Sequence, residues 1–206
     1  IDCGKFALVD YERSLNTDEA NKDLLFSDEH IFSLRGQNVK TDAEGVHKQI
    51  TGTDGNVQMA SGYQSILYLG DLEDYRLNWY KSFYIIKYTS DNSERFFPKM
   101  PMIRLSEMYL IAAEGWMEDD PEHAAELLQT LKQARTKSIV NKQTVTEEMI
   151  LLEMRKEFVG EGQLFYVYKR LNHDIIGNTS EDGVKASNSV FVLPLPEEEI
   201  EYGYRN

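Results

Sequence analysis

Three glutamates spaced four residues apart are the clearest candidates for chemistry in this chain of 206 residues. They are Glu153, Glu157 and Glu161. On a continuous helix this spacing places the three carboxylates on one face. Glycosidases use carboxylate pairs, one as the acid and the other as the base or nucleophile.

A structural role is nevertheless the favoured interpretation of these glutamates. Like charges four residues apart destabilise a solvated helix, so each carboxylate needs an opposite charge nearby. Catalytic carboxylates, in addition, normally converge on a pocket from different elements. The candidate ion-pair partners in the sequence are Arg104, Arg155 and Lys156. We therefore expect these groups to hold helices together, and we expect the chain not to be an enzyme.

Residue types that commonly bind metals or activate nucleophiles show no recognisable spacing. The four histidines are His30, His47, His123 and His173, and the only cysteine is Cys3. One cysteine excludes an internal disulfide and a multi-cysteine zinc site. The sequence also lacks an H-E-x-x-H motif, a G-x-S-x-G nucleophile elbow and a glycine-rich phosphate loop. We therefore expect neither a metal nor a cofactor.

Tyrosines at the edge of a polar segment are the candidates for ligand binding. Tyr63 and Tyr68 border a stretch that carries the amide side chains Gln37, Asn38 and Gln64. Sugars have flat C–H faces that stack on aromatic rings, while neighbouring amides bind their hydroxyl groups. Buried tyrosines, however, pack equally well when their hydroxyl groups find partners. Both interpretations stay open for these two tyrosines. Packing is expected for aromatic residues inside patterned segments, namely Trp79, Phe83, Tyr84 and Trp116.

The composition is that of a soluble globular protein without a nucleic-acid partner. Hydrophobic residues make up 41% of the chain and charged residues 28%, which is ordinary for a globular protein. The formal net charge of −13 opposes binding to phosphate backbones, which select clusters of Lys and Arg. The close group Lys132, Arg135 and Lys137 is instead expected near a helix C-terminus, where positive charge suits the helix dipole. No apolar run approaches the roughly 20 residues needed to span a bilayer.

Short strands and a long loop are predicted for the first half of the chain. The apolar run from Glu29 to Leu34 is typical of a strand. Residues 36–62 are rich in Gly, Asn, Asp, Thr and Gln, which predicts a loop, and loops of this length are usually functional or disordered. Residues 79–88 are rich in aromatic and β-branched side chains and predict a strand or a tight pair of strands.

Helices are predicted for most of the second half. Pro101 is expected in the first turn of a helix that continues to Trp116, because apolar residues recur at intervals of three and four. Residues 119–122, Asp-Asp-Pro-Glu, are expected to end that helix and cap the next one. So short a connection makes the two helices antiparallel, as in a tetratricopeptide hairpin, although the full repeat signature is absent.

A third helix and the fold class follow from the same signals. Thr144 and Glu147 form a capping-box pattern at its start, and Gly160 and Gly162 interrupt it. Residues 172–189 are polar and predict another loop. No linker or low-complexity segment divides the chain. We therefore predict one mostly α-helical domain over residues 1–206, with tetratricopeptide-like hairpins, long loops and a few short strands.

Several motifs, in the same order along the chain, resemble the C-terminal half of the SusD/RagB family. The first consists of Pro101, Arg104, Glu107, Ala113 and Glu114. The second is similar to the family pattern E-R-x-x-E-F-x-x-E-G and consists of Glu153, Glu157, Phe158, Glu161 and Gly162. Further landmarks are Asp74-Tyr75-Arg76, Lys87-Tyr88 and the closing Leu193-Pro194-Leu195-Pro196. The resemblance implies the C-terminal half of a SusD-like fold, in which the charged residues of the first two motifs are structural.

The resemblance also implies a function. The chain would bind oligosaccharide nutrients without catalysis, at the outer-membrane surface of Bacteroidetes. It would act there as a lid on a SusC-like TonB-dependent transporter. Membrane attachment would come only from a lipid anchor upstream of this sequence, because Cys3 follows just two residues and no signal peptide is present in the chain. The ligand would contact residues 36–68, and residues 172–189 could contribute.

Two other functions stay open. A helical-repeat module would bind proteins and no small molecule, and it would use the helices that carry Arg104, Glu107 and Glu114. An enzyme that uses Glu157 and Glu161 is the least favoured, because release of reducing sugar would require the two carboxylates to face an open cleft.

Overall fold

The computed structural model describes residues 1, 3–9, 14, 22–36, 38, 41–42, 44–45, 63–69, 71–81, 84–88, 99–177 and 183–196. Helices dominate and strands are few and short, as predicted. Where the sequence predicts one domain, the chain divides into two compact units, Ile1–Glu161 and Gly162–Asn206. Each unit is described by itself. None of the described helices is both long enough and apolar enough to cross a membrane.

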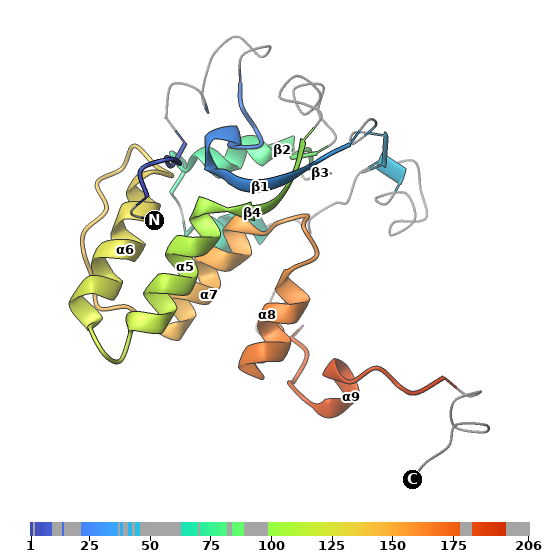
Figure 1. Cartoon of the computed structure of the whole chain (residues 1–206). Coiled ribbons are helices and arrows are strands. Elements are labelled where there is room, and N and C mark those ends of the chain that lie inside the picture. Colours follow the sequence, from blue (N-terminus) through green and yellow to red (C-terminus); the bar gives the residue numbers. More distant parts are fainter. Residues whose placement is uncertain are drawn as a thin grey trace. The chain divides into compact units, whose positions relative to one another are not determined.

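An antiparallel pair of strands in the first unit joins distant parts of the sequence. Strand β1 (His30–Arg35) follows the short 3-10 helix η2 (Ser27–Glu29) and pairs with β4 (Lys99–Arg104), as Figure 1 shows. The predicted strand at residues 29–34 is therefore confirmed. The prediction that Pro101 opens a helix is wrong, because Pro101 lies in β4 opposite Ser33. A two-stranded sheet tolerates proline, since each strand has an edge that needs no N–H donor.

The aromatic segment forms the tight pair of strands that the sequence predicts. Helix α3 (Tyr63–Tyr68) and the 3-10 helix η3 (Tyr75–Trp79) precede β2 (Tyr80–Lys81), which pairs antiparallel with β3 (Tyr84–Ile85). Trp79 is fully buried among apolar side chains, and its ring centroid lies 5.0 Å from that of Phe26. Its indole nitrogen donates a hydrogen bond of 2.7 Å to the carbonyl of Leu24, which satisfies its one polar group.

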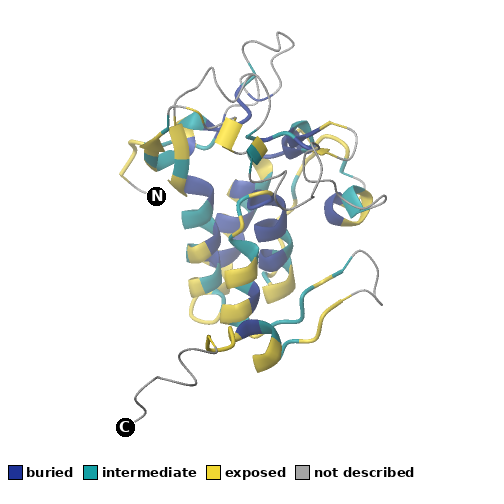
Figure 2. Cartoon of the chain, turned by 90° about the vertical axis from the view of Figure 1, so that its right-hand side faces the viewer, coloured by how far each residue is buried: buried dark blue, intermediate teal, exposed yellow. Residues whose placement is uncertain are grey.

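Three helices complete the first unit. Helices α5 (Leu105–Trp116) and α6 (Pro121–Gln133) form the predicted antiparallel hairpin, and α7 (Glu147–Glu157) packs against α5 (Figure 1). Asp120 caps α6 as predicted, because its carboxylate accepts a hydrogen bond of 3.0 Å from the amide of His123. Buried positions concentrate on the sides of the helices that face one another, and exposed positions lie outside (Figure 2).

The two ends of α7 differ from the sequence prediction. The cap at its start is Thr146, whose hydroxyl accepts from the amide of Met149, so the capping box predicted at Thr144 and Glu147 is wrong. The helix ends at Glu157, and Gly160 then adopts a φ of +74°, which favours glycine. Glu161 therefore lies beyond the helix, and the three glutamates do not share one continuous helical face.

The second unit contains a helix, a bridged loop and one further turn of helix. Helix α8 (Leu164–Leu171) comes first and α9 (Asn188–Phe191) last. Between them, in the predicted loop, Ile175 and Val184 form an isolated antiparallel bridge. The carboxylate of Asp174 closes the base of this loop, because it pairs with Lys185 at 2.6 Å and accepts from the amide of Ala186 at 2.9 Å.

Candidate functional site

Glu157, at the last turn of α7, lies at the centre of a buried ionic network. Its side chain is fully buried. One carboxylate oxygen accepts from Arg135 Nε at 2.6 Å and from Arg76 Nη1 at 3.0 Å, and the other lies 3.5 Å from Arg104 Nη1. Its backbone carbonyl accepts from Arg104 and from Lys87, each at 3.0 Å. Glu157 thus contacts four basic side chains that are far from it in the sequence.

The other two glutamates extend the network in opposite directions. Glu153 lies 2.9 Å from Arg76 Nη1 through one oxygen and 2.9 Å from Lys156 Nζ through the other. Glu161 accepts a hydrogen bond of 2.8 Å from Arg104 and a further one from Lys87. The hydroxyl of Tyr88 donates to the same Glu161 oxygen at 3.1 Å.

Two further carboxylates complete the charge balance. Asp74 binds the guanidinium of Arg76 through both oxygens, at 2.9 and 2.6 Å. Glu29, next to β1, accepts a hydrogen bond of 2.8 Å from Arg135 Nη2 through one oxygen; its other oxygen lies 2.8 Å from Arg135 Nη1 and accepts from the amide of Val9 at 2.8 Å. The two parallel hydrogen bonds between Asp74 and Arg76 give geometric specificity as well as energy.

The charges of the network sum to zero. The acidic members are Glu29, Asp74, Glu153, Glu157 and Glu161, and the basic members are Arg76, Lys87, Arg104, Arg135 and Lys156. All are buried except Glu161, whose side chain is nearly so. Burial of an unpaired charge costs several kcal/mol, so such groups persist inside a protein only when they are paired and hydrogen-bonded. The balance agrees with the structural role expected for these glutamates.

Electrostatics holds Glu153, Glu157 and Glu161 in the ionised form. Burial by itself raises the pKa of Glu157, but the guanidinium groups of Arg135, Arg76 and Arg104 outweigh it and hold the pKa well below its usual range. The pKa values of Glu153 and Glu161 are lowered for the same reason, against the opposing effect of burial. A general acid needs a raised pKa, so that it still carries its proton near neutral pH. None of these three glutamates is therefore prepared for the proton donation that glycosidases require.

Two of the three predicted partners pair with the glutamates, and one lies elsewhere. Lys156 and Arg104 pair with the glutamates as expected, whereas Arg155 instead donates to the hydroxyl of Tyr63 at 2.5 Å. Arg135, expected as a helix-end charge, is fully buried in the network. Its position just after α6 places it opposite Glu157, and the pairing explains its burial. Arg76, Lys87 and Arg135 were not predicted as partners, although the first two belong to the SusD-like landmarks.

Two other glutamates of the first motif lie on α5, outside the network as defined. Glu107 and Glu114 are half-buried. Burial raises the pKa of Glu107, although Arg104 opposes the shift. Both residues make contacts within the unit, so their positions agree with packing of α5 and show no open binding geometry.

The predicted ligand-binding residues fall into different environments. Tyr63 and its neighbour Gln64 are half-buried, Asn38 is exposed, and Gln37 lies outside the described residues. The guanidinium of Arg155 lies 5.2 Å from the centre of the Tyr63 ring and also binds its hydroxyl. This double contact fixes the ring orientation.

Tyr68, for which stacking and packing both stayed open, is buried. Its side chain is 2% exposed, and its ring packs edge-on against Tyr80 at 6.1 Å between centroids. Its hydroxyl lies 3.5 Å from that of Tyr80, which gives the polar tip a partner. Burial raises the pKa of Tyr68 well above its usual value. A sugar could stack on this ring only if the core opened, so the structure supports the packing interpretation.

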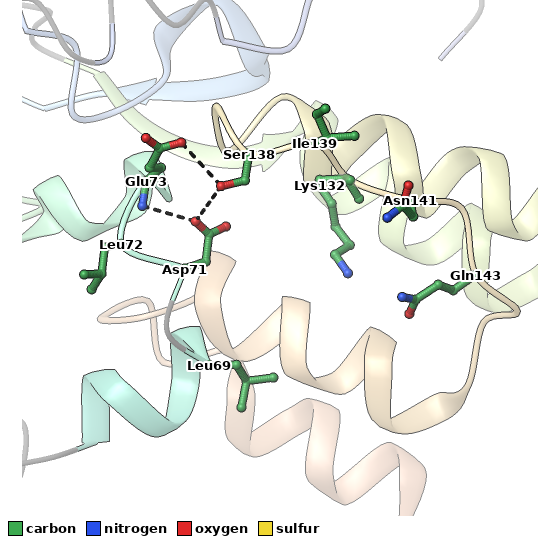
Figure 3. Close-up of a pocket in the computed structure, with 10 residues that line it drawn as sticks. Leu69, Asp71, Leu72, Glu73, Lys132, Ser138, Ile139, Asn141 and Gln143 are labelled. Carbon is green, nitrogen blue, oxygen red and sulfur yellow. Dashed lines mark hydrogen bonds between the residues drawn. The ribbon is translucent and has the colours of Figure 1, made fainter.

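An open hollow lies on another face of the first unit (Figure 3). It has a volume of about 520 Å³ and lies between the segment after α3 and the connection from α6 to α7. Asp71 and Glu73 line it from one side, and their carboxylates accept from the hydroxyl of Ser138 at 3.4 and 3.3 Å. Lys132 and Gln143 face it from the other side (Figure 3). Its lining contains no aromatic ring.

Metal binding finds no support in the part of the chain that the structure describes. No group of three histidine, cysteine, aspartate or glutamate side chains there is arranged to hold an ion. Cys3, the one cysteine of the sequence, is exposed.

A helical hairpin, a third helix and a buried, charge-balanced network at the helix ends together define a protein with the SusD-type fold. The SusD family model matches residues 29–201, which is most of the chain. The chain belongs to the SusD family.

Solved structures agree with this assignment. A SusD superfamily protein from Bacteroides thetaiotaomicron VPI-5482 is 25% identical with a TM-score of 0.74, and the match covers 98% of this chain and 52% of that one. A protein from Bacteroides vulgatus ATCC 8482, described as a "putative sugar binding protein", is 29% identical with a TM-score of 0.55, over 69% of this chain and 36% of that one.

A SusD-like carbohydrate binding protein, also from Bacteroides vulgatus ATCC 8482, shares the fold at 16% identity and a TM-score of 0.62. That match covers 96% of this chain and 51% of the other. The chain thus spans about half the length of these structures or less. The comparison with curated proteins gave no match.

Proposed function

We propose that the chain binds oligosaccharides at the cell surface and delivers them to a SusC-like TonB-dependent transporter in the outer membrane. The observation that carries the proposal is the match to the SusD family over residues 29–201. The 29% identical relative from Bacteroides vulgatus, which is named for sugar binding, supports a carbohydrate as the ligand. A lipid anchor upstream of this sequence would hold the protein at the membrane.

The ionic network supports binding without catalysis. A glycosidase needs two carboxylates that flank the substrate, one of them with a raised pKa. In this chain Glu157 is inaccessible, and the pKa values of Glu157 and Glu161 are lowered. Both side chains are already engaged by buried cations.

Tyr63 is the residue through which we propose that the glycan is recognised. Its ring is partly accessible, and Arg155 holds it in place through the hydroxyl. A ring that is already fixed loses little conformational entropy on stacking, so more of the contact energy appears as affinity. Gln64 is adjacent in sequence, and Asn38 and Gln37 lie in the same polar region, where amides would bind sugar hydroxyls.

Calorimetric titration with a panel of neutral oligosaccharides tests this proposal. We expect Tyr63→Ala to weaken binding about tenfold, in keeping with the loss of one aromatic contact. Tyr63→Phe keeps the ring but loses the hydrogen bond to Arg155, so we expect a smaller loss.

Tyr166→Ala is the matched control. Tyr166 is 69% exposed and is not one of the residues to which we assign glycan binding. If no glycan in the panel releases heat, the proposal fails, and the helical-repeat interaction module becomes the better interpretation. If Tyr63→Ala and Tyr166→Ala have equal effects, glycan binding stands but its assignment to Tyr63 is wrong.

A further inference from the structure

Three aliphatic side chains stand almost fully in solvent around the hollow of Figure 3. Leu69 is 73% exposed, Leu72 84% and Ile139 88%. Single exposed aliphatic residues are ordinary, but several gathered around one hollow with a polar interior are typical of an interaction site. Leu69 also has a φ of +49°, a conformation that non-glycine residues adopt rarely and that costs energy.

The segment that carries Leu69 and Leu72 is fixed to the rest of the unit. Asp71 accepts from the hydroxyl of Thr136 at 3.1 Å, and Asp74 and Thr136 form an antiparallel bridge. The amide of Tyr75 donates to the carbonyl of Arg135 at 2.6 Å, next to the buried network. Hydrogen bonds therefore tie the backbone next to these aliphatic side chains to the rest of the unit.

The segment that carries Ile139 is fixed by two glutamines of α6. Gln129 donates from its side chain to the carbonyl of Val140 at 2.8 Å. Gln133 donates to the carbonyl of Ser138 at 3.1 Å and accepts from the amide of Val140 at 3.0 Å. These three side-chain hydrogen bonds hold the backbone on both sides of Ile139, in a loop of a length that is usually functional.

The hollow separates charges of opposite sign. Asp71 and Glu73 lie on one side, and Lys132 lies on the other (Figure 3). Within the described residues, no hydrogen bond or ion pair engages the side chains of Lys132, Asn141 or Gln143. The hollow thus offers two carboxylates, an ammonium group, two amides and an aliphatic rim.

We propose that this hollow is a docking site for an extended segment of a partner protein. The segment carries a basic residue for Asp71 and Glu73, aliphatic side chains for the rim, and an acidic residue for Lys132. The free amides of Asn141 and Gln143 then bind its backbone, as in other complexes that recognise extended peptides. The proposal does not depend on glycan binding.

Two observations favour a protein segment over a sugar. The lining has no aromatic ring on which a sugar could stack. The aliphatic side chains stand at the rim, where a protein surface can cover them and a small ligand at the bottom of the hollow cannot.

Methyl NMR titration of the complete chain tests the proposal. The probe is the peptide acetyl-Lys-Leu-Ile-Glu-amide, which carries the proposed chemistry. Two control peptides lack one feature each: acetyl-Gln-Leu-Ile-Gln-amide has no charge, and acetyl-Lys-Ser-Ser-Glu-amide has no aliphatic side chain. We expect saturable shifts at the methyl groups of Leu69, Leu72 and Ile139, and about tenfold weaker binding of both control peptides.

Variants locate the binding site. Leu72→Ser and Ile139→Ser change exposed side chains, so the fold is preserved, and each is expected to weaken binding of the probe. Ile111→Ser is the matched control, because Ile111 is 52% exposed on α5 and does not line the hollow. Glu73→Gln and Lys132→Gln are expected to reduce the preference for the charged peptide.

Three outcomes would overturn the proposal: no saturable shift at these methyl groups, equal binding of acetyl-Lys-Ser-Ser-Glu-amide, or an equal effect of Ile111→Ser. Shifts of the same methyl groups on addition of an oligosaccharide, without any response to the peptide, would assign the hollow to a sugar instead. Because glycan binding is tested by calorimetry at Tyr63, the two proposals can fail separately.

Discussion

Arg135 and Glu157 join the ends of two helices through a hydrogen bond of 2.6 Å from Nε to the carboxylate. Arg135 follows α6, and Glu157 is the last residue of α7. Both are fully buried, so neither charge could remain there without the other. The remaining edge of the guanidinium binds Glu29, which ties the start of β1 to the same point.

Arg135→Ala should therefore be strongly destabilising. The substitution leaves the carboxylates of Glu157 and Glu29 short of a buried cation, which typically costs about 3–5 kcal/mol. Urea unfolding followed by circular dichroism measures the change. Lys142→Ala is the control, because Lys142 pairs with Glu122 at the surface and its loss should have no measurable effect. Equal unfolding midpoints for the two variants would contradict the structural role of the network.

Stability should fall on the acidic side of neutrality. The folded-state pKa values of Glu153, Glu157 and Glu161 lie below the ordinary value of 4.5. The unfolded chain therefore binds protons more readily, and the stabilisation is complete above pH 4.5 and is lost as the pH falls toward the folded-state values. Denaturant unfolding at a series of pH values from 7 downward measures the slope. A free energy of unfolding that does not change with pH below 4.5 would contradict the ion pairs of these glutamates.

Lys87 should make stability rise with pH in alkali as well. Burial and the nearby charge of Arg104 lower its pKa from 10.5 to about 8. Between these values the unfolded chain binds more protons, so this group makes the free energy of unfolding rise with pH, by on the order of 3 kcal/mol. The comparison is between the wild type and Lys87→Met, which lacks the titrating group.

The difference between the pH profiles of the wild type and Lys87→Met separates the effect of Lys87 from that of the tyrosines. Tyr88 has a raised pKa because of burial and Glu161, and it makes stability fall above pH 10 in both proteins. A wild-type profile parallel to that of Lys87→Met between pH 8 and 10 would show that the pKa of Lys87 is not lowered.

The start of α7 provides a paired test of helix capping. Thr146→Ala removes the hydroxyl that accepts from the amide of Met149, which should cost about 1 kcal/mol. Thr144→Ala changes the same residue type two positions earlier, where the sequence predicts a cap and the structure has none. Thermal and urea unfolding should rank Thr144→Ala as the milder variant. If Thr144→Ala were the more destabilising variant, the capping box at Thr144 and Glu147 would be the better description of this helix start.

Local signals in the sequence identified the elements whose cause is local. Asp120 before Pro121 marks a helix start because both act within one turn. The strand at residues 29–34 and the strand pair within residues 79–88 follow from side-chain composition alone. Pro101 was misassigned because its strand depends on pairing with Ser33, far away in the sequence.

The ion-pair partners, too, could not be predicted from local sequence signals. Spacing along one helix pointed to Arg155, whereas Glu157 binds Arg135, 22 positions away, and Arg76, 81 positions away. Tyr68 is a further case. Its sequence neighbours do not reveal that it is packed against Tyr80. Partners brought together by tertiary packing leave no periodic trace in one sequence.

The charge balance of the network has a consequence for the outer surface of the molecule. Because its five cations and five anions cancel, the excess of 13 negative charges belongs entirely to the other residues of the chain. This excess repels acidic polysaccharides, such as those rich in uronic acid, before any contact forms. The repulsion weakens with added salt, as the Debye length contracts to about 8 Å at physiological ionic strength. Uncharged polymers approach without this barrier.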